Sequence, residues 1–162
     1  GFAAAIAAHF EVRLGSRRPL VIVVEPDRAA CVLRSVQAAR RVRIAHGEPT
    51  IMSMLECFEP SLLALRVLER CADAFLAIPD ELAVRAMRAL AFPQGKDPAL
   101  VSGESGAAGL AGLLALLEEP AWRAQAQLTP DTHVLLFSTE SATDAGANER
   151  MVGIPPTSVI KR

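Results

Sequence analysis

The stretch Val101-Ser102-Gly103-Glu104-Ser105-Gly106, continued by residues 107–117, decides how this chain is interpreted. Its pattern predicts the end of a short strand, a polar turn bracketed by glycines, and then an apolar helix. Residues 134–140 repeat the design, with an apolar strand at 134–137 and Ser138-Thr139-Glu140 as the turn. Ligands of open α/β sheets bind beyond the carboxyl ends of the strands, so we expect the two turns to face one ligand.

Strands and helices alternate along the rest of the chain. The apolar runs predict strands at residues 20–24, 74–78, 100–101 and 134–137. Helical spacing predicts helices at 2–14, 29–40, 62–70, 80–90, 107–117, 122–128 and 144–151, whereas 50–57 fits either a strand or a helix. The order predicts an α/β fold in which a mostly parallel sheet is flanked by helices, a three-layer, Rossmann-like arrangement.

The two ends of the chain differ in pattern. Phe2, Ile6 and Phe10 follow helical spacing, so we expect the first helix to bury that face. The chain lacks an initial methionine and its first residues already have a helical pattern, which indicates a fragment. We expect one incomplete domain at residues 1–153 and an irregular tail at 154–162, where Pro155 and Pro156 lie.

Composition excludes several classes of function. The 162 residues carry a net charge of −1, and no basic stripe suited to nucleic acid occurs. No apolar run approaches the roughly 20 residues of a membrane span. Hydrophobic residues still make up 51% of the chain. This share indicates either an alanine-rich core or an apolar surface that another domain or subunit covers.

Cysteine and histidine spacing argues against a metal site and a disulfide framework. The three cysteines, Cys31, Cys57 and Cys71, are odd in number and form no CxxC pair. The three histidines are far apart and lack the spacing of metal ligands. We therefore expect no metal, and a reducing, cytoplasmic compartment.

Thr139 and Glu104 are the candidate ligand-binding residues. A hydroxyl at a strand end can pair with a heteroaromatic nitrogen, but Thr139 also suits the N-cap of the segment that follows. Glu104 can act as an acid, a base or an orienting carboxylate, but it also suits the first turn of a helix, where it complements the dipole. Ser102 or Ser105 is expected to cap that helix.

The chain lacks several catalytic signatures. Its two lysines are Lys96, in a loop, and Lys161, in the tail, and neither is expected to be a buried, activated amine. Neither GxSxG nor a P-loop occurs.

Several segments together resemble one enzyme family. They are Val24-Glu25-Pro26-Asp27-Arg28-Ala29-Ala30-Cys31, Gly47-Glu48-Pro49-Thr50-Ile51-Met52, Glu56-Cys57-Phe58-Glu59-Pro60, the turn at 102–106, and Ser138-Thr139-Glu140 with Thr143-Asp144. In order and spacing, the chain up to about Gly153 resembles the diaminopropionate ammonia-lyases. These belong to the tryptophan-synthase-like, fold type II enzymes that use pyridoxal 5'-phosphate.

The resemblance implies an α,β-elimination that converts 2,3-diaminopropionate to pyruvate and ammonia. It implies that this chain corresponds to the C-terminal part of a homodimeric enzyme, with an amino acid as its small-molecule substrate. The catalytic lysine would lie outside this chain, so the chain alone would be inactive. Gly1 would be the last residue of the phosphate loop, Thr139 would face the pyridine nitrogen, and Glu104 would line the cofactor pocket.

One position departs from the family pattern, and one rival interpretation stays open. Ser141 stands where the family usually has glycine, so the turn beside Thr139 is expected to be distorted if that glycine has a positive φ. The rival is a non-catalytic, Rossmann-like module that binds a small ligand or a protein, because fold alone does not decide function.

Overall fold

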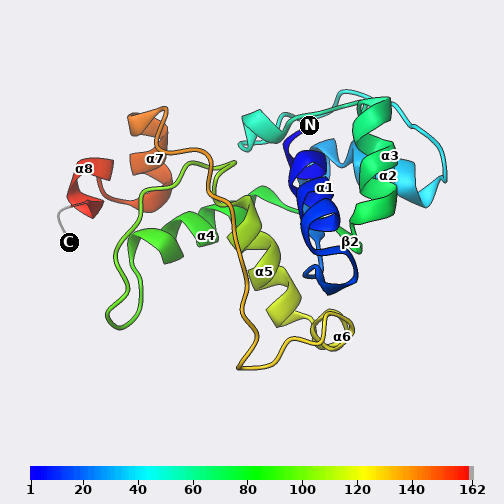
Figure 1. Cartoon of the computed structure of the whole chain (residues 1–162). Helices are drawn as coiled ribbons and strands as arrows, with labels where there is room; N and C mark the ends of the chain where they lie inside the picture. Colours follow the sequence, from blue (N-terminus) through cyan, green and yellow to red (C-terminus); the bar gives the residue numbers. More distant parts are fainter. Residues whose placement is uncertain (161–162) are drawn as a thin grey trace. The chain divides into compact units, whose positions relative to one another are not determined.

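The computed structural model describes residues 1–160 (Figure 1). These residues form two compact units. The first contains Gly1–Thr50 and Leu55–Ala77, and the second contains Ile51–Met54 and the chain from Ile78 onward. None of the helices in the described part is both long enough and apolar enough to span a membrane.

The first unit contains a small sheet and the helices that flank it in sequence. β1 covers Ile22–Pro26 and pairs with β2, Ala74–Ile78, in a two-stranded parallel sheet. The predicted strand at 74–78 is confirmed, and the one at 20–24 begins two residues later than expected. The other elements are α1 (Phe2–Leu14), α2 (Cys31–Gln37), α3 (Leu62–Cys71) and the 3-10 helices η1 (Gly15–Arg17) and η2 (Asp27–Ala29). A further 3-10 helix, η3 (Ser53–Leu55), begins in the segment that belongs to the second unit.

The core of the first unit lies where α1 packs on α3. Ala4 and Ala7 of α1 are buried with Val23, Leu68 and Cys71. The predicted face of α1 is wrong, because Phe2 is 56% exposed and neither Ile6 nor Phe10 is fully buried. Small alanine side chains let the two helix backbones approach closely, so the alanine face is the one that packs.

The second unit is built mainly from helices and the loops that join them. Its elements are α4 (Asp80–Ala91), α5 (Ala108–Glu118), α6 (Pro120–Gln125), α7 (Ala145–Val152) and α8 (Pro156–Val159). α4 packs against both α5 and α7, and Ala83, Ala86 and Met87 of α4 are almost completely buried. The Arg88 guanidinium donates to the carbonyl of Met151 at 2.7 Å, which joins α4 to the end of α7.

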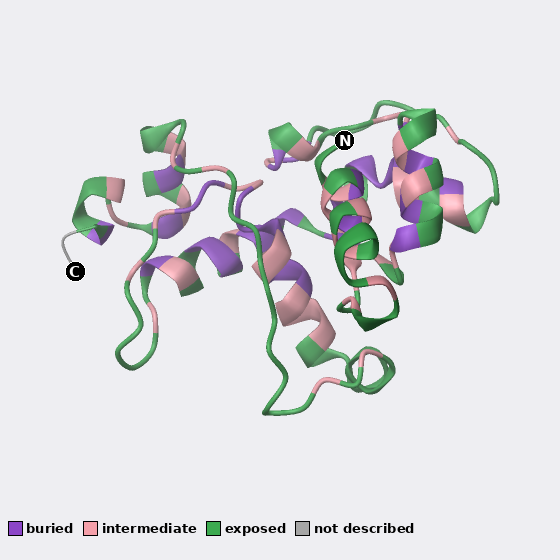
Figure 2. Cartoon of the chain, in the orientation of Figure 1, coloured by how far each residue is buried: buried purple, intermediate pink, exposed green. Residues whose placement is uncertain are grey.

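Two predicted strands and the irregular tail are corrected. Residues 100–101 and 134–137 are not strands, and the sheet in residues 1–160 contains β1 and β2 alone. A strand requires a neighbouring strand to pair with, and neither segment pairs with one in the described part of the chain. Residues 129–139 are exposed and run as an extended trace between α6 and α7 (Figure 2). The predicted irregular tail contains the short helix α8.

Candidate functional site

The turn at 102–106 leads into α5 and is largely buried. Ser102, Gly103 and Gly106 are buried, and Glu104 is half-buried. The N–H of Ala107 donates to the carbonyl of Gly103 at 3.0 Å, so the chain makes one helical turn before α5 begins at Ala108. Glu104 lies within this turn and its carboxylate has no hydrogen bond described within residues 1–160.

The second predicted turn lies against the first. The N–H of Gly103 donates to the carbonyl of Glu140 at 3.0 Å, and the hydroxyls of Ser102 and Ser138 are 3.0 Å apart. The Glu140 carboxylate oxygen Oε2 accepts from the backbone N–H of Ser105 at 2.8 Å and of Gly106 at 3.3 Å. The two turns therefore converge, although the strands expected to bring them together do not form.

The three predicted site residues belong to two different units. Glu104 belongs to the first turn, and Thr139, which is exposed, lies in the second turn, next to Glu140. Gly1 lies in the other compact unit, where it is exposed and precedes α1. No side chain caps the N-terminus of α1 in the described part of the chain. The structure therefore brings Glu104 and Thr139 onto converging turns, and it describes Gly1 as an uncapped helix start.

The capping roles considered as alternatives are not the ones observed. α5 has no side-chain cap, and Glu104 precedes its first turn. Ser105 instead accepts the N–H of Met54 at 3.2 Å through its hydroxyl. α7 is capped by Asp144, whose carboxylate accepts the N–H of Ala147 at 2.9 Å, so Thr139 is not its cap.

The expectation of backbone strain beside Thr139 is corrected. Ser141 does not have a positive φ, so serine fits there without the expected distortion. A Cβ added at Gly109 would meet Leu136 at 3.6 Å, an ordinary contact, so glycine is not required at that position of α5. The close approach lies instead at Gly103 and Gly106.

Sequence reasoning missed two residues that build the site. Glu140 was part of the quoted turn, but nothing in its spacing showed that its carboxylate reaches back to Ser105 and Gly106. Asn148 of α7 is buried and donates through its amide to the carbonyl of Ser102 at 2.9 Å. The only available signal was the pair of glycines around Glu104, which indicated a close approach by some other group.

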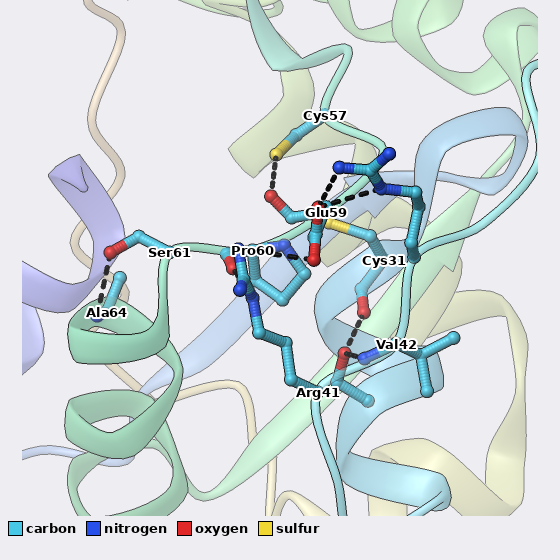
Figure 3. A network of polar contacts seen from close by, with 10 residues as sticks. Cys31, Arg41, Val42, Cys57, Glu59, Pro60, Ser61 and Ala64 are labelled. Atoms are coloured by element: carbon cyan, nitrogen blue, oxygen red, sulfur yellow. Dashed lines mark hydrogen bonds and ion pairs between the residues drawn. The ribbon is translucent and has the colours of Figure 1, made fainter.

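A separate polar cluster in the first unit is structural (Figure 3). Arg43 pairs with Glu59 at 2.6 Å, and this contact lowers the pKa of the Glu59 carboxyl. The Cys57 thiol donates to the carbonyl of Glu59 at 3.3 Å, and burial raises the pKa of Cys31 to about 12. A thiol with such a pKa is not a nucleophile near neutral pH.

Glu25 ends β1 and caps α2. Its carboxylate accepts the N–H of Val32 at 2.9 Å and of Leu33 at 2.8 Å, and burial raises its pKa. Both oxygens are used by the helix N-terminus. Glu25 therefore stabilises the strand-to-helix connection and is not counted among the ligand-binding candidates.

Comparison with known proteins identifies the family. The family described as "Pyridoxal-phosphate dependent enzyme" matches residues 1–140. The chain belongs to this family. Its fold is that of the fold type II enzymes, of which the chain covers a part, and its cofactor class is pyridoxal phosphate.

Several relatives of this chain are diaminopropionate ammonia-lyases. The chain is 40% identical over 126 residues to the one from Escherichia coli K12 and 34% identical over 157 residues to the one from Salmonella typhimurium LT2. These matches cover 76% and 93% of this chain but 32% and 39% of the relatives. The chain thus spans about a third of the length of the curated relatives it matches.

Solved structures agree with these sequence matches. The E. coli diaminopropionate ammonia-lyase in complex with D-serine has a TM-score of 0.81 at 34% identity, with 93% of this chain and 38% of that chain covered. A threonine deaminase from T.th. has a TM-score of 0.60 at 27% identity, with 74% and 39% covered.

The converging turns of the second unit carry polar side chains of the kind that a pyridine-ring cofactor requires. The two converging turns supply a hydroxyl, Thr139, and a carboxylate, Glu104, neither of which is used for helix capping. A hydroxyl that can donate or accept and a carboxylate that can accept suit the polar atoms of a substituted pyridine ring. Lys96 lies exposed in the loop after α4, and Lys161 lies outside the described residues. Neither is assigned a covalent role.

Proposed function

We propose that this chain is part of an ammonia-lyase that converts 2,3-diaminopropionate to pyruvate and ammonia with pyridoxal phosphate as cofactor. The observation that carries the proposal is the convergence of the turns at 102–106 and 138–140, because it brings the backbones that bear Glu104 and Thr139 together. The names of the relatives supply the substrate and the release of ammonia, and the resemblance to the family implies pyruvate as the other product.

Each proposed role follows from the chemistry of the side chain. The Thr139 hydroxyl is neutral, so it can bond the pyridine nitrogen without requiring that nitrogen to be protonated. The Glu104 carboxylate lies on the neighbouring turn, where it can accept a hydrogen bond from the cofactor and so orient the ring. Gly1 leaves room for an anion at the N-terminus of α1, where the backbone N–H groups of an uncapped helix start and the helix dipole favour a phosphate.

The overall reaction is balanced by one water. The substrate loses the hydrogen of Cα as a proton and the amine of Cβ with its bonding electrons, and hydrolysis then releases the second amine. One diaminopropionate and one water give one pyruvate and two ammonia. When bound, pyridoxal phosphate supplies the electron sink for the bond broken at Cα. The side chains of Thr139 and Glu104 hold and orient that group.

We also propose the substrate class, the location and the oligomeric state of the complete enzyme. We expect an amino-acid substrate, a cytoplasmic location and a homodimer in the complete enzyme, and the bacterial relatives named above are consistent with that location. The rival, a non-catalytic module, is not favoured, because the curated relatives named here are ammonia-lyases.

The cofactor assignment is tested with pyridoxine 5'-phosphate, which needs no lysine to bind. We expect its addition to shift the backbone NMR signals of Glu104 and Thr139. T139V should weaken binding about fivefold, as the loss of one hydrogen bond predicts. T157V, in the exposed first turn of α8, is the matched control and should bind like the wild type. Shifts confined to other residues would refute the assignment.

The isolated chain is expected to be inactive. With pyridoxal phosphate and 2,3-diaminopropionate it should release no pyruvate, because no residue of the chain is assigned the covalent lysine role. A coupled lactate dehydrogenase assay measures this release, with the E. coli relative as the positive control. Turnover by the isolated chain, or a borohydride-stable cofactor adduct at a single lysine, would contradict the proposal.

A further inference from the structure

Glu140 makes hydrogen bonds to the first turn, residues 102–106, through both its side chain and its backbone. Its Oε2 accepts the N–H of Ser105 at 2.8 Å and of Gly106 at 3.3 Å, and its Oε1 lies 3.4 Å from the Thr143 hydroxyl that donates to it. Its backbone carbonyl accepts the N–H of Gly103 at 3.0 Å. One residue therefore binds three backbone N–H groups of the first turn.

The first turn is shaped to admit this residue. A Cβ at Gly103 would lie 2.7 Å from Oε2 of Glu140 and 2.5 Å from the carbonyl oxygen of Ser141. A Cβ at Gly106 would overlap the carbonyl oxygen of Glu140 and lie 2.8 Å from the Ser102 hydroxyl. Both glycines have ordinary negative φ, so they are needed for the space they leave and not for their backbone conformation.

The hydrogen bonds of Glu140 involve residues that are adjacent in sequence to the two candidate cofactor-binding residues, Glu104 and Thr139. Its N–H partners are Gly103, immediately before Glu104, and Ser105 and Gly106, immediately after it. Glu140 itself follows Thr139 directly. Fixing these peptide groups fixes the backbone of Glu104 on one turn and of Thr139 on the other. A carboxylate bonded to several backbone N–H groups makes charge-assisted bonds, which are stronger than neutral ones.

We propose that Glu140 is a positioning residue that sets the relation of Glu104 to Thr139 for the pyridine ring of the cofactor. This inference rests on the proposed function and deepens it, because it names the group that holds the two turns in a fixed relative position. Glu140 acts through the backbone and does not itself contact the ring.

The first test examines the ligand-free chain. The amide protons of Ser105 and Gly106 should resonate downfield in the wild type, because both donate to a carboxylate. They should move upfield and exchange faster with solvent in E140A, less so in E140Q, which keeps an acceptor without the charge. E149Q, on the exposed face of α7, is the matched control and should leave both signals in place. Unchanged Ser105 and Gly106 signals in E140A would overturn the proposal.

The second test separates positioning from general stability by titration with pyridoxine 5'-phosphate. E140A should bind about tenfold more weakly than the wild type. Its saturating shifts at Glu104 and Thr139 should also differ from those of the wild type. E140Q should restore part of the affinity. V152A, which truncates a buried side chain at the C-terminal end of α7, should lower the thermal midpoint and bind normally.

The outcomes distinguish the two proposals. If the wild type binds the probe and E140A binds it equally well with the same shifts, Glu140 is not a positioning residue and the proposed function stands. If V152A loses as much affinity as E140A, the effect is one of stability and the inference is overturned. If the wild type binds no probe at Glu104 and Thr139, the proposed function fails and this inference fails with it.

Discussion

Several carboxylates in this chain accept hydrogen bonds from backbone N–H groups at or just before helix starts. Glu25 accepts two at the start of α2, Asp144 accepts one at the start of α7, and Glu140 accepts two at the turn before α5. A buried or half-buried N–H without a partner costs about 1–3 kcal/mol, so each of these side chains replaces water that the fold excludes. The sequence identified Asp144 as a helix start, but the partners of Glu25 and Glu140 depend on the chain folding back.

Glycine at position 103 is predicted to be essential, whereas glycine at position 109 is not. G103A should lower the free energy of unfolding by about 1–3 kcal/mol, because its Cβ collides with the Glu140 carboxylate and a backbone carbonyl. G109A should raise stability by up to about 1 kcal/mol, since alanine favours the helix and its Cβ has ordinary contacts. Urea denaturation measures both, and equal effects would contradict the crowding seen at Gly103.

Asp73 is predicted to make the first unit sensitive to acid. Its carboxylate pairs with the Arg18 guanidinium at 2.6 and 2.9 Å and accepts the N–H of Val21 at 2.7 Å, so its pKa is lowered from the usual 3.8. A lowered pKa contributes stability above the unfolded value, and that stability is lost as the pH falls through the folded value.

The measurement for Asp73 is the thermal midpoint between pH 7 and pH 2. D73N should have a lower midpoint than the wild type near pH 7, and the two should converge below about pH 4. E118Q breaks the exposed pair with Arg85 and is the control, with little expected change. A constant difference across the whole range would show that the charge of Asp73 is not the cause.

At the scale of elements, the helices follow their local pattern, whereas two of the four predicted strands do not form. α3, α4 and α7 lie within two residues of their expected bounds. Helices bond within a single segment, whereas strands need a neighbour. Residues 134–137 have the apolar composition of a strand, yet they lie exposed with no strand beside them in the described residues. Apolar composition thus indicates a tendency to form a strand, and the presence of a neighbouring strand decides whether the strand forms.

The packing of α1 on α3 is predicted to depend on the size of the buried alanines. A7L should destabilise the chain by about 1–3 kcal/mol, because Ala7 is fully buried against a core that includes Leu68. A5L, on the exposed side of the same helix, should change stability by less than about 0.5 kcal/mol. Chemical denaturation compares the two variants, and a neutral A7L would show that the helices are not in close contact.

At the scale of the whole molecule, apolar side chains lie on the surface of both units. In the segment at 134–137, Val134, Leu135, Leu136 and Phe137 are 46%, 65%, 39% and 40% exposed. An exposed, extended, apolar segment is a template for pairing with another chain. This agrees with the 51% hydrophobic content of the sequence and predicts that the isolated chain associates in solution.

L135D is predicted to reduce this association. Sedimentation velocity at high protein concentration should show large species for the wild type and fewer for L135D. L63D, which replaces a side chain 73% exposed on α3, is the control for added charge alone and should have a smaller effect. A compact wild-type monomer at high concentration would refute the prediction.

The sequence by itself determined the local elements and the candidate side chains of this protein. Helical spacing, the strand at 74–78 and the glycines around Glu104 act over a few residues, and such short-range preferences can be read along the chain. Only the tertiary structure decided which face of α1 is buried, whether residues 134–137 pair, and that Glu140 joins the two turns. These depend on groups that are distant in sequence and meet only after folding, so no local pattern specifies them.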